Sequence, residues 1–285
     1  MLRRSLLATP LLLLPARAVA PLRVVASFSV LADMVRQIGG AGVIVDSIVG
    51  IGGDVHEYEA KPSDLGKLAA ADLIVLNGLG LDNWMKRLIQ ASGSKALVIV
   101  AGAAVAPRAL PGGITDPHAW HNPANGVLYA RAIAAGLLIL PSVDQAAVQR
   151  NAAQFIAAIE ATDRWCAAQF AAIPADRRQI VTSHDAFGYY AARYGLVIHP
   201  VRGVDNAEPS AAAFAGLVKR LQGVKGVVFL EIMTNPSLLT ALAQETGAKI
   251  GGSLYADSLS APDGPAGNYL AMIRYNTNTI IAGLK

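Results

Sequence analysis

The chain has 285 residues, of which 53% are hydrophobic and 15% are charged, and its formal net charge is +4. Loss of the three N-terminal arginines, Arg3, Arg4 and Arg17, would leave 21 basic and 20 acidic side chains, so the charge favours neither nucleic acid nor an anionic membrane as a partner. The single cysteine, Cys166, excludes an internal disulfide framework.

The first 20 residues have the parts of a secretory signal peptide. Arg3 and Arg4 precede a short apolar run over residues 6–14, and alanines at positions 16, 18 and 20 offer cleavage points. The run is shorter than the roughly 20 residues that cross a bilayer, and no cysteine lies near the cleavage points to carry a lipid. We therefore expect a periplasmic protein that is exported through residues 1–20 and has no membrane anchor.

Beyond this segment, short β-branched runs alternate with alanine- and leucine-rich segments of helical periodicity, which predicts parallel sheets built from β-α-β units. The runs form two groups of four. We therefore expect an α/β fold with two lobes, each a four-stranded, mostly parallel sheet flanked by helices. The expected strands are 22–30, 43–49, 72–79 and 96–101 in the first lobe, and 179–183, 196–201, 226–231 and 248–254 in the second. The expected helices include 31–39, 64–70, 185–194, 210–221 and 236–246.

The segment between the two groups, residues 142–173, contains neither glycine nor proline, and Ser142 and Pro174 mark its two ends. As one helix, at 1.5 Å per residue, it would be about 45 Å long. This predicts one long, rigid linker helix, and the alternative is two helices with an unmarked break. The expected organisation is a signal peptide at 1–20, an N-terminal lobe at 21–141, the linker helix at 142–173 and a C-terminal lobe at 174–285.

Side chains that are able to bind a metal follow the expected strands. His56 and His118 come after the second and fourth strands, His184 ends the first strand of the second group, and Asp257 follows the last strand. Because ligands bind beyond the carboxyl ends of strands in open parallel sheets, we expect these four side chains to face a cleft between the lobes. Three imidazoles and one carboxylate fill the tetrahedral set of Zn(II), whereas a catalytic zinc keeps one position open.

The histidine pair in TDPHAWHNP raises a separate question. Pro123 disfavours helical backbone at Asn122, so His118 and His121 are not expected to share one face. We expect one ligand from the pair, His118, and a solvated His121 at the rim of the cleft.

Two other residues allow two interpretations each, and two more have a simple structural one. Glu231 could orient a ligand imidazole or be an ordinary strand-end carboxylate. Trp120 could pack in the core or form the wall of the cleft. Asp116 could do no more than cap a turn, and we expect His199 to be structural.

The chain resembles the zinc/manganese solute-binding proteins of bacterial ABC transporters, the ZnuA/TroA-like family. The likeness covers nearly the whole chain after the signal peptide, and the motifs that carry it are, in order, VVASFSVLADMVRQIGG, GGDVHEYEAKPSDLGKLAAADLIVLNGLGLDNW, DPHAW, VTSHDAFGYYAARYGL, and LYADSLS with NYLAMIRYNTNTI. The family fold is two α/β lobes joined by one long helix. The resemblance implies that His56, His118, His184 and Asp257 bind a divalent metal ion. It also implies a protein that delivers the ion to an ABC transporter permease in the inner membrane. We expect the protein to be a monomer.

Two departures from the family pattern bear on the metal. Family motifs usually have an apolar or neutral residue at the position of His121. Many zinc-specific members carry a long His- and acid-rich loop before the second motif, where this chain reads AGAAVAPRALPGGIT, so we expect no metal capture by such a loop. The third ligand is His184 rather than glutamate, which favours Zn(II), with Mn(II) as the alternative.

An alternative from a different class is a zinc-dependent hydrolase, which would need an open coordination position and a general base. The sequence contains neither an HExxH pattern nor a nucleophile elbow. We therefore expect the protein not to be an enzyme. An adhesin role is a third possibility, and no sequence feature favours it.

Overall fold

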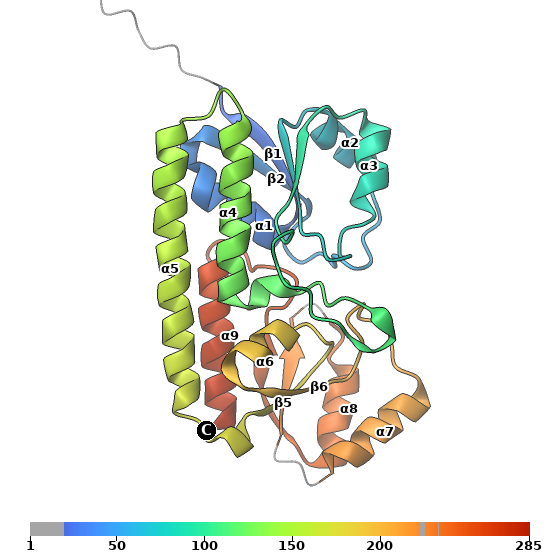
Figure 1. Ribbon diagram of the computed structural model, residues 1–285. Helices are drawn as coiled ribbons and strands as arrows, with labels where there is room; N and C mark the ends of the chain where they lie inside the picture. Colours follow the sequence, from blue (N-terminus) through green and yellow to red (C-terminus); the bar gives the residue numbers. More distant parts are fainter. Residues whose placement is uncertain (1–19, 223–225, 233) are drawn as a thin grey trace, which may run out of the picture.

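The computed structural model describes residues 20–222, 226–232 and 234–285. The predicted signal peptide lies outside the described residues except for Ala20. Two α/β lobes are stacked along the molecule, with long helices beside them (Figure 1). Each lobe contains a four-stranded parallel sheet with helices packed against it, so the predicted fold class is confirmed.

The sheet of the first lobe has the strand order β2-β1-β3-β4. Every pairing in it is parallel. The central strands are buried along almost their whole length, as expected where helices cover both faces. Its elements are β1 (Leu22–Phe28), α1 (Ser29–Gly39), β2 (Val43–Val49), α2 (Pro62–Ala69), β3 (Leu73–Leu76), α3 (Met85–Ser92) and β4 (Leu97–Val100).

The sheet of the second lobe repeats this order as β6-β5-β7-β8, again with parallel pairings. In both sheets the first strand in sequence lies between two neighbours, which is the arrangement that creates a crevice at the carboxyl ends of the strands. Its elements are β5 (Gln179–Thr182), α6 (Gly188–Tyr194), β6 (Val197–Pro200), α7 (Ala211–Leu221), β7 (Val227–Glu231), α8 (Ser237–Thr246) and β8 (Lys249–Leu254).

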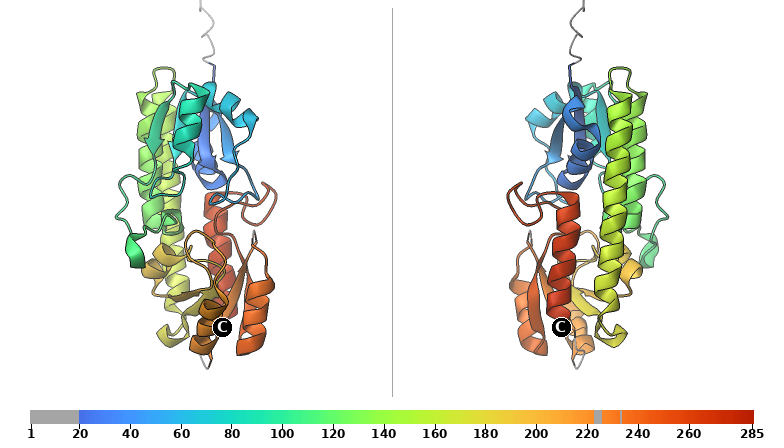
Figure 2. Two further views of the ribbon diagram at one scale, coloured as in Figure 1. Left: turned by 90° about the vertical axis from the view of Figure 1, so that its right-hand side faces the viewer. Right: turned by 90° about the vertical axis from the view of Figure 1, so that its left-hand side faces the viewer.

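The predicted linker is one unbroken helix, α5 (Gln145–Ala171), and not two. It is shorter than the predicted 142–173 because Asp144 caps it: the Asp144 carboxylate accepts a hydrogen bond from the backbone N–H of Ala147 at 2.9 Å. Its 27 residues correspond to about 40 Å. Figure 2 shows this helix running beside both lobes.

Two further long helices, which were not among the predicted elements, pack against α5. They are α4 (Pro123–Ile139) and α9 (Tyr269–Leu284), and α9 also packs against β8. The linker is therefore one member of a helical layer, and the exact lobe boundaries stay a prediction. Within the described ranges, no helix combines the length and apolar character needed to span a membrane.

Candidate metal centre

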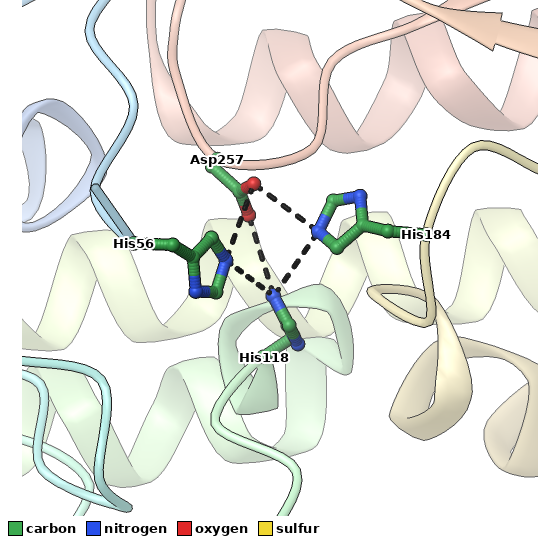
Figure 3. Close-up of side chains that lie close together, drawn as sticks. All are labelled: His56, His118, His184 and Asp257. Carbon is green, nitrogen blue, oxygen red and sulfur yellow. Dashed lines mark hydrogen bonds and ion pairs between the residues drawn. The ribbon is translucent and has the colours of Figure 1, made fainter. Parts of the chain in front are cut away.

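Four side chains from four separate segments meet at one point between the lobes (Figure 3). His56 lies in the loop after β2, His118 just before a short 3₁₀ helix (Ala119–His121), His184 after β5, and Asp257 after β8. Their facing nitrogen and oxygen atoms all lie within 4.8 Å of one another. The structure thus brings together the four residues that the sequence predicted.

The spacing of these atoms can be compared with that of metal ligands. The Nε2 atom of His118 lies 3.2 Å from Nε2 of His56 and 3.3 Å from Nε2 of His184. The Asp257 carboxylate lies 3.6, 3.5 and 3.2 Å from Nε2 of His56, His118 and His184, respectively. Four ligands at 2.0–2.1 Å from a tetrahedral zinc ion are about 3.3–3.4 Å apart. The five separations above, at 3.2–3.6 Å, are therefore close to those of ligands around an ion of this size.

Two of the imidazoles are oriented by buried carboxylates. His118 Nδ1 lies 2.9 Å from Asp116 Oδ1, and His184 Nδ1 lies 2.6 Å from Glu231 Oε2. When each Nδ1–H donates a hydrogen bond to the carboxylate, the lone pair of Nε2 points toward the centre of the cluster. Two such lone pairs 3.3 Å apart repel one another unless a proton or a cation lies between them. The geometry is therefore that of a cation site.

Both carboxylates also hold the backbone of the residue that they orient. Asp116 Oδ1 accepts a hydrogen bond from the backbone N–H of His118 at 2.9 Å, and Glu231 Oε1 accepts one from His184 N–H at 3.2 Å. Asp116 therefore stabilises a turn and orients a ring at the same time. Of the two interpretations of Glu231, the structure favours a partner that orients His184.

The charges around the site shift the pKa values of its residues in different directions. Burial alone would lower the pKa of His184, but Glu231 and Asp257 outweigh it and raise the pKa well above its usual value. Burial lowers the pKa of His118. Burial opposes ionisation of Asp257 as well, yet His184 holds the pKa of Asp257 well below its usual range. The raised pKa of His184 means that protons compete with a metal ion for this nitrogen.

The prediction for His121 is wrong. Its side chain is not solvated at the cleft rim but fully buried, with its ring centroid 4.5 Å from that of Phe187 and 5.4 Å from that of Trp120. Its ring packs in this aromatic layer and is not one of the four side chains of the cluster. Neither ring nitrogen has a hydrogen-bond partner among the described residues, and burial lowers the pKa of His121 to about 3.

Trp120 combines the two roles considered for it. It is fully buried, with its ring centroid 4.9 Å from that of Phe28 and 5.2 Å from that of His118. Its indole Nε1 donates a hydrogen bond to the backbone oxygen of Ala256 at 3.2 Å, one residue before Asp257. His199, in contrast, lies outside the cluster, with Nε2 3.3 Å from Gln179 Oε1.

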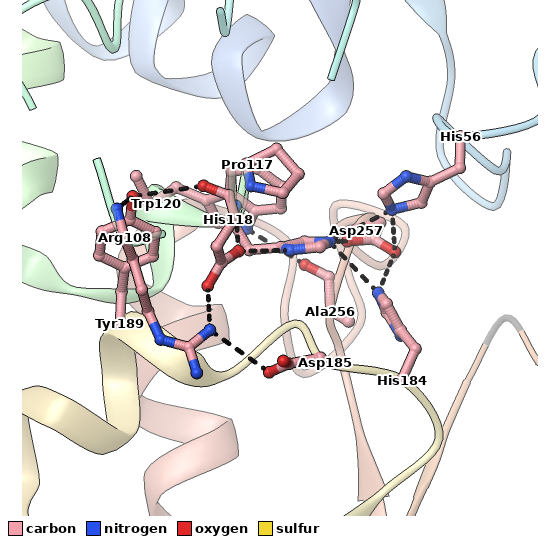
Figure 4. A network of polar contacts seen from close by, with 12 residues as sticks. His56, Arg108, Pro117, His118, Trp120, His184, Asp185, Tyr189, Ala256 and Asp257 are labelled. Carbon is pink, nitrogen blue, oxygen red and sulfur yellow. Dashed lines mark hydrogen bonds and ion pairs between the residues drawn. The ribbon is translucent and has the colours of Figure 1, made fainter. Parts of the chain in front are cut away.

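Sequence reasoning missed a polar network that includes Arg108, Asp185 and Tyr189 (Figure 4). Arg108 Nη1 lies 2.9 Å from Asp116 Oδ2 and 3.6 Å from Asp185 Oδ1, which belongs to the second lobe. The backbone N–H of Arg108 donates to the Tyr189 hydroxyl at 2.7 Å, and that hydroxyl donates to the backbone oxygen of Asp116 at 3.2 Å. An added Cβ at Gly188 would lie 2.2 Å from the Arg108 guanidinium, so the glycine makes room for it. No spacing in the sequence signals this pairing, because Arg108 belongs to an irregular loop.

Comparison with known proteins identifies the family of the chain. The profile of the ZnuA family, described as the periplasmic component A of a zinc-uptake complex, matches residues 24–283. The iron-binding protein YfeA of Yersinia pestis is 31% identical over 275 residues, which cover 94% of this chain and 88% of YfeA. The manganese-binding lipoprotein MntA of Halalkalibacterium halodurans is 30% identical over 267 residues, covering 92% and 88% of the two chains.

A solved structure shows the same fold. The periplasmic zinc-binding protein TroA from Treponema pallidum has a TM-score of 0.88 and 27% identity, covering 93% of this chain and 99% of TroA. Two α/β lobes beside a continuous helix, with a cation site between them, define a metal-binding solute-binding protein. The chain belongs to the ZnuA family, whose members are binding components of ABC transporters and not enzymes.

Proposed function

We propose that this protein binds one Zn(II) ion between its lobes through His56, His118, His184 and Asp257 and delivers it to an ABC permease. The observation that carries the proposal is the convergence of three Nε2 atoms and one carboxylate within 4.8 Å of one another, with two of the rings oriented by buried carboxylates. Ligand sets that are rich in imidazole suit zinc. A carboxylate that accepts a hydrogen bond from Nδ1, here called a clamp, raises the basicity of the imidazole that it orients.

The choice of metal is the finer part of the proposal. The relatives named above are described as iron-binding, manganese-binding and zinc-binding proteins. Mn(II) is a harder ion that prefers oxygen ligands, and this cluster offers a single carboxylate. We therefore place Zn(II) first, with Mn(II) as the alternative within the same transport function.

Equilibrium dialysis followed by elemental analysis tests the proposal. At about pH 7.5, where unperturbed imidazoles are neutral, the mature chain should retain one equivalent of Zn(II). In parallel dialysis against Zn(II), Mn(II) and Fe(II) together, zinc should be the metal retained. Less than about half an equivalent of tightly held metal of any kind would refute the binding function. Retention of manganese in preference to zinc would refute only the choice of metal.

The remaining parts of the proposal concern the cellular setting. We place the protein in the periplasm as a monomer, supported by the signal-like residues 1–20 and by the periplasmic description of the family. Its functional units would be the lobes at 21–141 and 174–285, joined through 142–173. Cell fractionation of the full chain tests the location, and light scattering of the mature chain tests the monomer.

A further inference from the structure

A cavity of about 450 Å³ lies beside the metal centre, with His56 in its wall. Its walls come from both lobes, and we call it the mouth. The first lobe contributes His56, Leu79 and Ile114, and the second contributes Val204 and Asp205. We propose that the metal ion enters and leaves through this mouth, with His56 as the ligand that exchanges, while His118, His184 and Asp257 form a pre-arranged set of three. This inference rests on the proposed function and assigns its route.

The four metal-binding side chains are not held equally. The rings of His118 and His184 are fully buried, and each has its Nδ1 against a carboxylate. Nδ1 of His56 has no such carboxylate partner in the described part of the chain. His56 is also the one member of the cluster that lines the mouth, and Figure 4 shows it on the far side of the cluster from the Arg108 network. Exposure does not separate His56 from Asp257, because their side chains are 8% and 12% exposed. His56 differs in that it lines the mouth while its Nδ1 has no carboxylate partner among the described residues, so its ring can move toward the mouth without breaking such a contact.

The alternative opening, beside Asp257, is much smaller. The cavity between Asp257, Asn206 and Tyr255 has a volume of about 10 Å³, which is room for about one water molecule. An ion that carries hydration water cannot pass through it without a rearrangement of the chain. The mouth, in contrast, already has room for such an ion.

One residue of the mouth has an unfavourable backbone conformation. In the described ranges, Leu79 and Asn206 are the two non-glycine residues with positive φ, at 55° and 59°. Leu79 forms part of the wall of the mouth, whereas Asn206 lines the smaller cavity beside Asp257. Left-handed backbone at a leucine is unfavourable and tends to persist where function requires it. The strain at Leu79 therefore supports a functional role for this wall of the mouth.

Hydrogen bonds between the lobes would have to break if the metal ion entered by wide separation of the lobes. The segments that carry His118 and Asp257 are joined through Trp120 and Ala256. The chain just after Asp257 is bonded to the first lobe, because the backbone N–H of Gly52 donates to Ser258 Oγ at 2.8 Å and that of Leu259 donates to Ser29 Oγ at 3.1 Å. Movement of His56 in its own loop leaves the bond between Trp120 and Ala256 intact.

A blocking experiment tests the route. Ile114 is 53% exposed in the mouth, and Ile139, at the end of α4, is 67% exposed. The native Cys166 is buried, so Ile114→Cys and the control Ile139→Cys can each be labelled with a bulky maleimide. Zn(II) association and its release to a chelator are then followed by stopped flow. Labelling Ile114→Cys should slow both rate constants at least about tenfold with little change in Kd, and labelling Ile139→Cys should change neither.

A second arm tests the role of His56. Removal of an unclamped fourth ligand should leave three, so His56→Ala should keep about one equivalent of Zn(II) and release it at least about tenfold faster. His184→Ala should lose tight binding. Equal exchange rates for the labelled and unlabelled Ile114→Cys protein, or loss of all binding in His56→Ala alone, would overturn the inference while the binding function stands. A wild-type protein that binds no metal would refute the proposed function and this inference together.

Discussion

The carboxylate of Asp116 offers the most informative single substitution outside the metal-binding side chains. It is fully buried, and its two oxygens contact His118 Nδ1 and Arg108 Nη1, each at 2.9 Å. Asp116→Asn keeps the shape of the side chain and removes its charge. Loss of a partner that orients a metal-binding imidazole reduces metal affinity about 10- to 100-fold, which corresponds to about 1.4–2.7 kcal/mol. We expect a loss within this range.

The assay is competition for Zn(II) against a chromophoric chelator of known affinity at neutral pH. Asp144→Asn is the matched control, because it makes the same chemical change at the N-cap of α5, where asparagine also caps well. The control should bind zinc as the wild type does. If folded Asp116→Asn binds zinc with an affinity within about twofold of that of the wild type, the charge of the buried carboxylate does not contribute to metal binding through His118. That result would refute the proposed role of Asp116.

Three further predictions concern protons, His121 and Arg108. Since His184 has a raised pKa, it is protonated in the metal-free protein at neutral pH, so Zn(II) binding should release about one proton; calorimetry in two buffers of different ionisation enthalpy measures this, and a value of zero would contradict it. For the same reason, the affinity for zinc should fall as the pH is lowered, and this fall should begin at a pH higher than the ordinary histidine pKa of about 6.5. His121→Leu should leave zinc affinity within about twofold and raise the free energy of unfolding by about 1 kcal/mol, because it removes a buried imidazole without partners; a large loss of affinity in the competition assay would show that His121 acts on the metal. Arg108→Met should lower the free energy of unfolding in urea by about 1–2 kcal/mol, because the buried Asp116 loses a partner whose side chain is 34% exposed; an unchanged unfolding midpoint would show that the pair is not stabilising.

The fold and the meeting of the four side chains were predictable because both follow from local patterns. Alternation of β-branched runs with helical segments predicts parallel sheets, and the residues just after the strands of such a sheet lie at one edge of it. This reasoning placed His56, His118, His184 and Asp257 together without knowledge of tertiary contacts. The linker was also predictable, because a glycine- and proline-free segment of that length favours one helix.

The features that the sequence did not reveal depend on packing between distant segments. The sequence predicted a solvated His121 because polar residues in loops usually face solvent. In the structure, the ring of His121 packs against Phe187 from the other lobe. The pairing of Arg108 with Asp116 and Asp185 joins an irregular loop to the opposite lobe. Helix α4 carries apolar residues all around its surface, so it lacks the stripe that marks an amphipathic helix.

The proposed metal centre is tested most directly by a crystal structure of the zinc-loaded protein, with diffraction data collected on both sides of the zinc absorption edge. We expect one anomalous peak between the lobes, at about 2.0–2.2 Å from Nε2 of His56, His118 and His184 and from a carboxylate oxygen of Asp257. A peak at another place, or one in contact with His121 in place of any of these four, would contradict it.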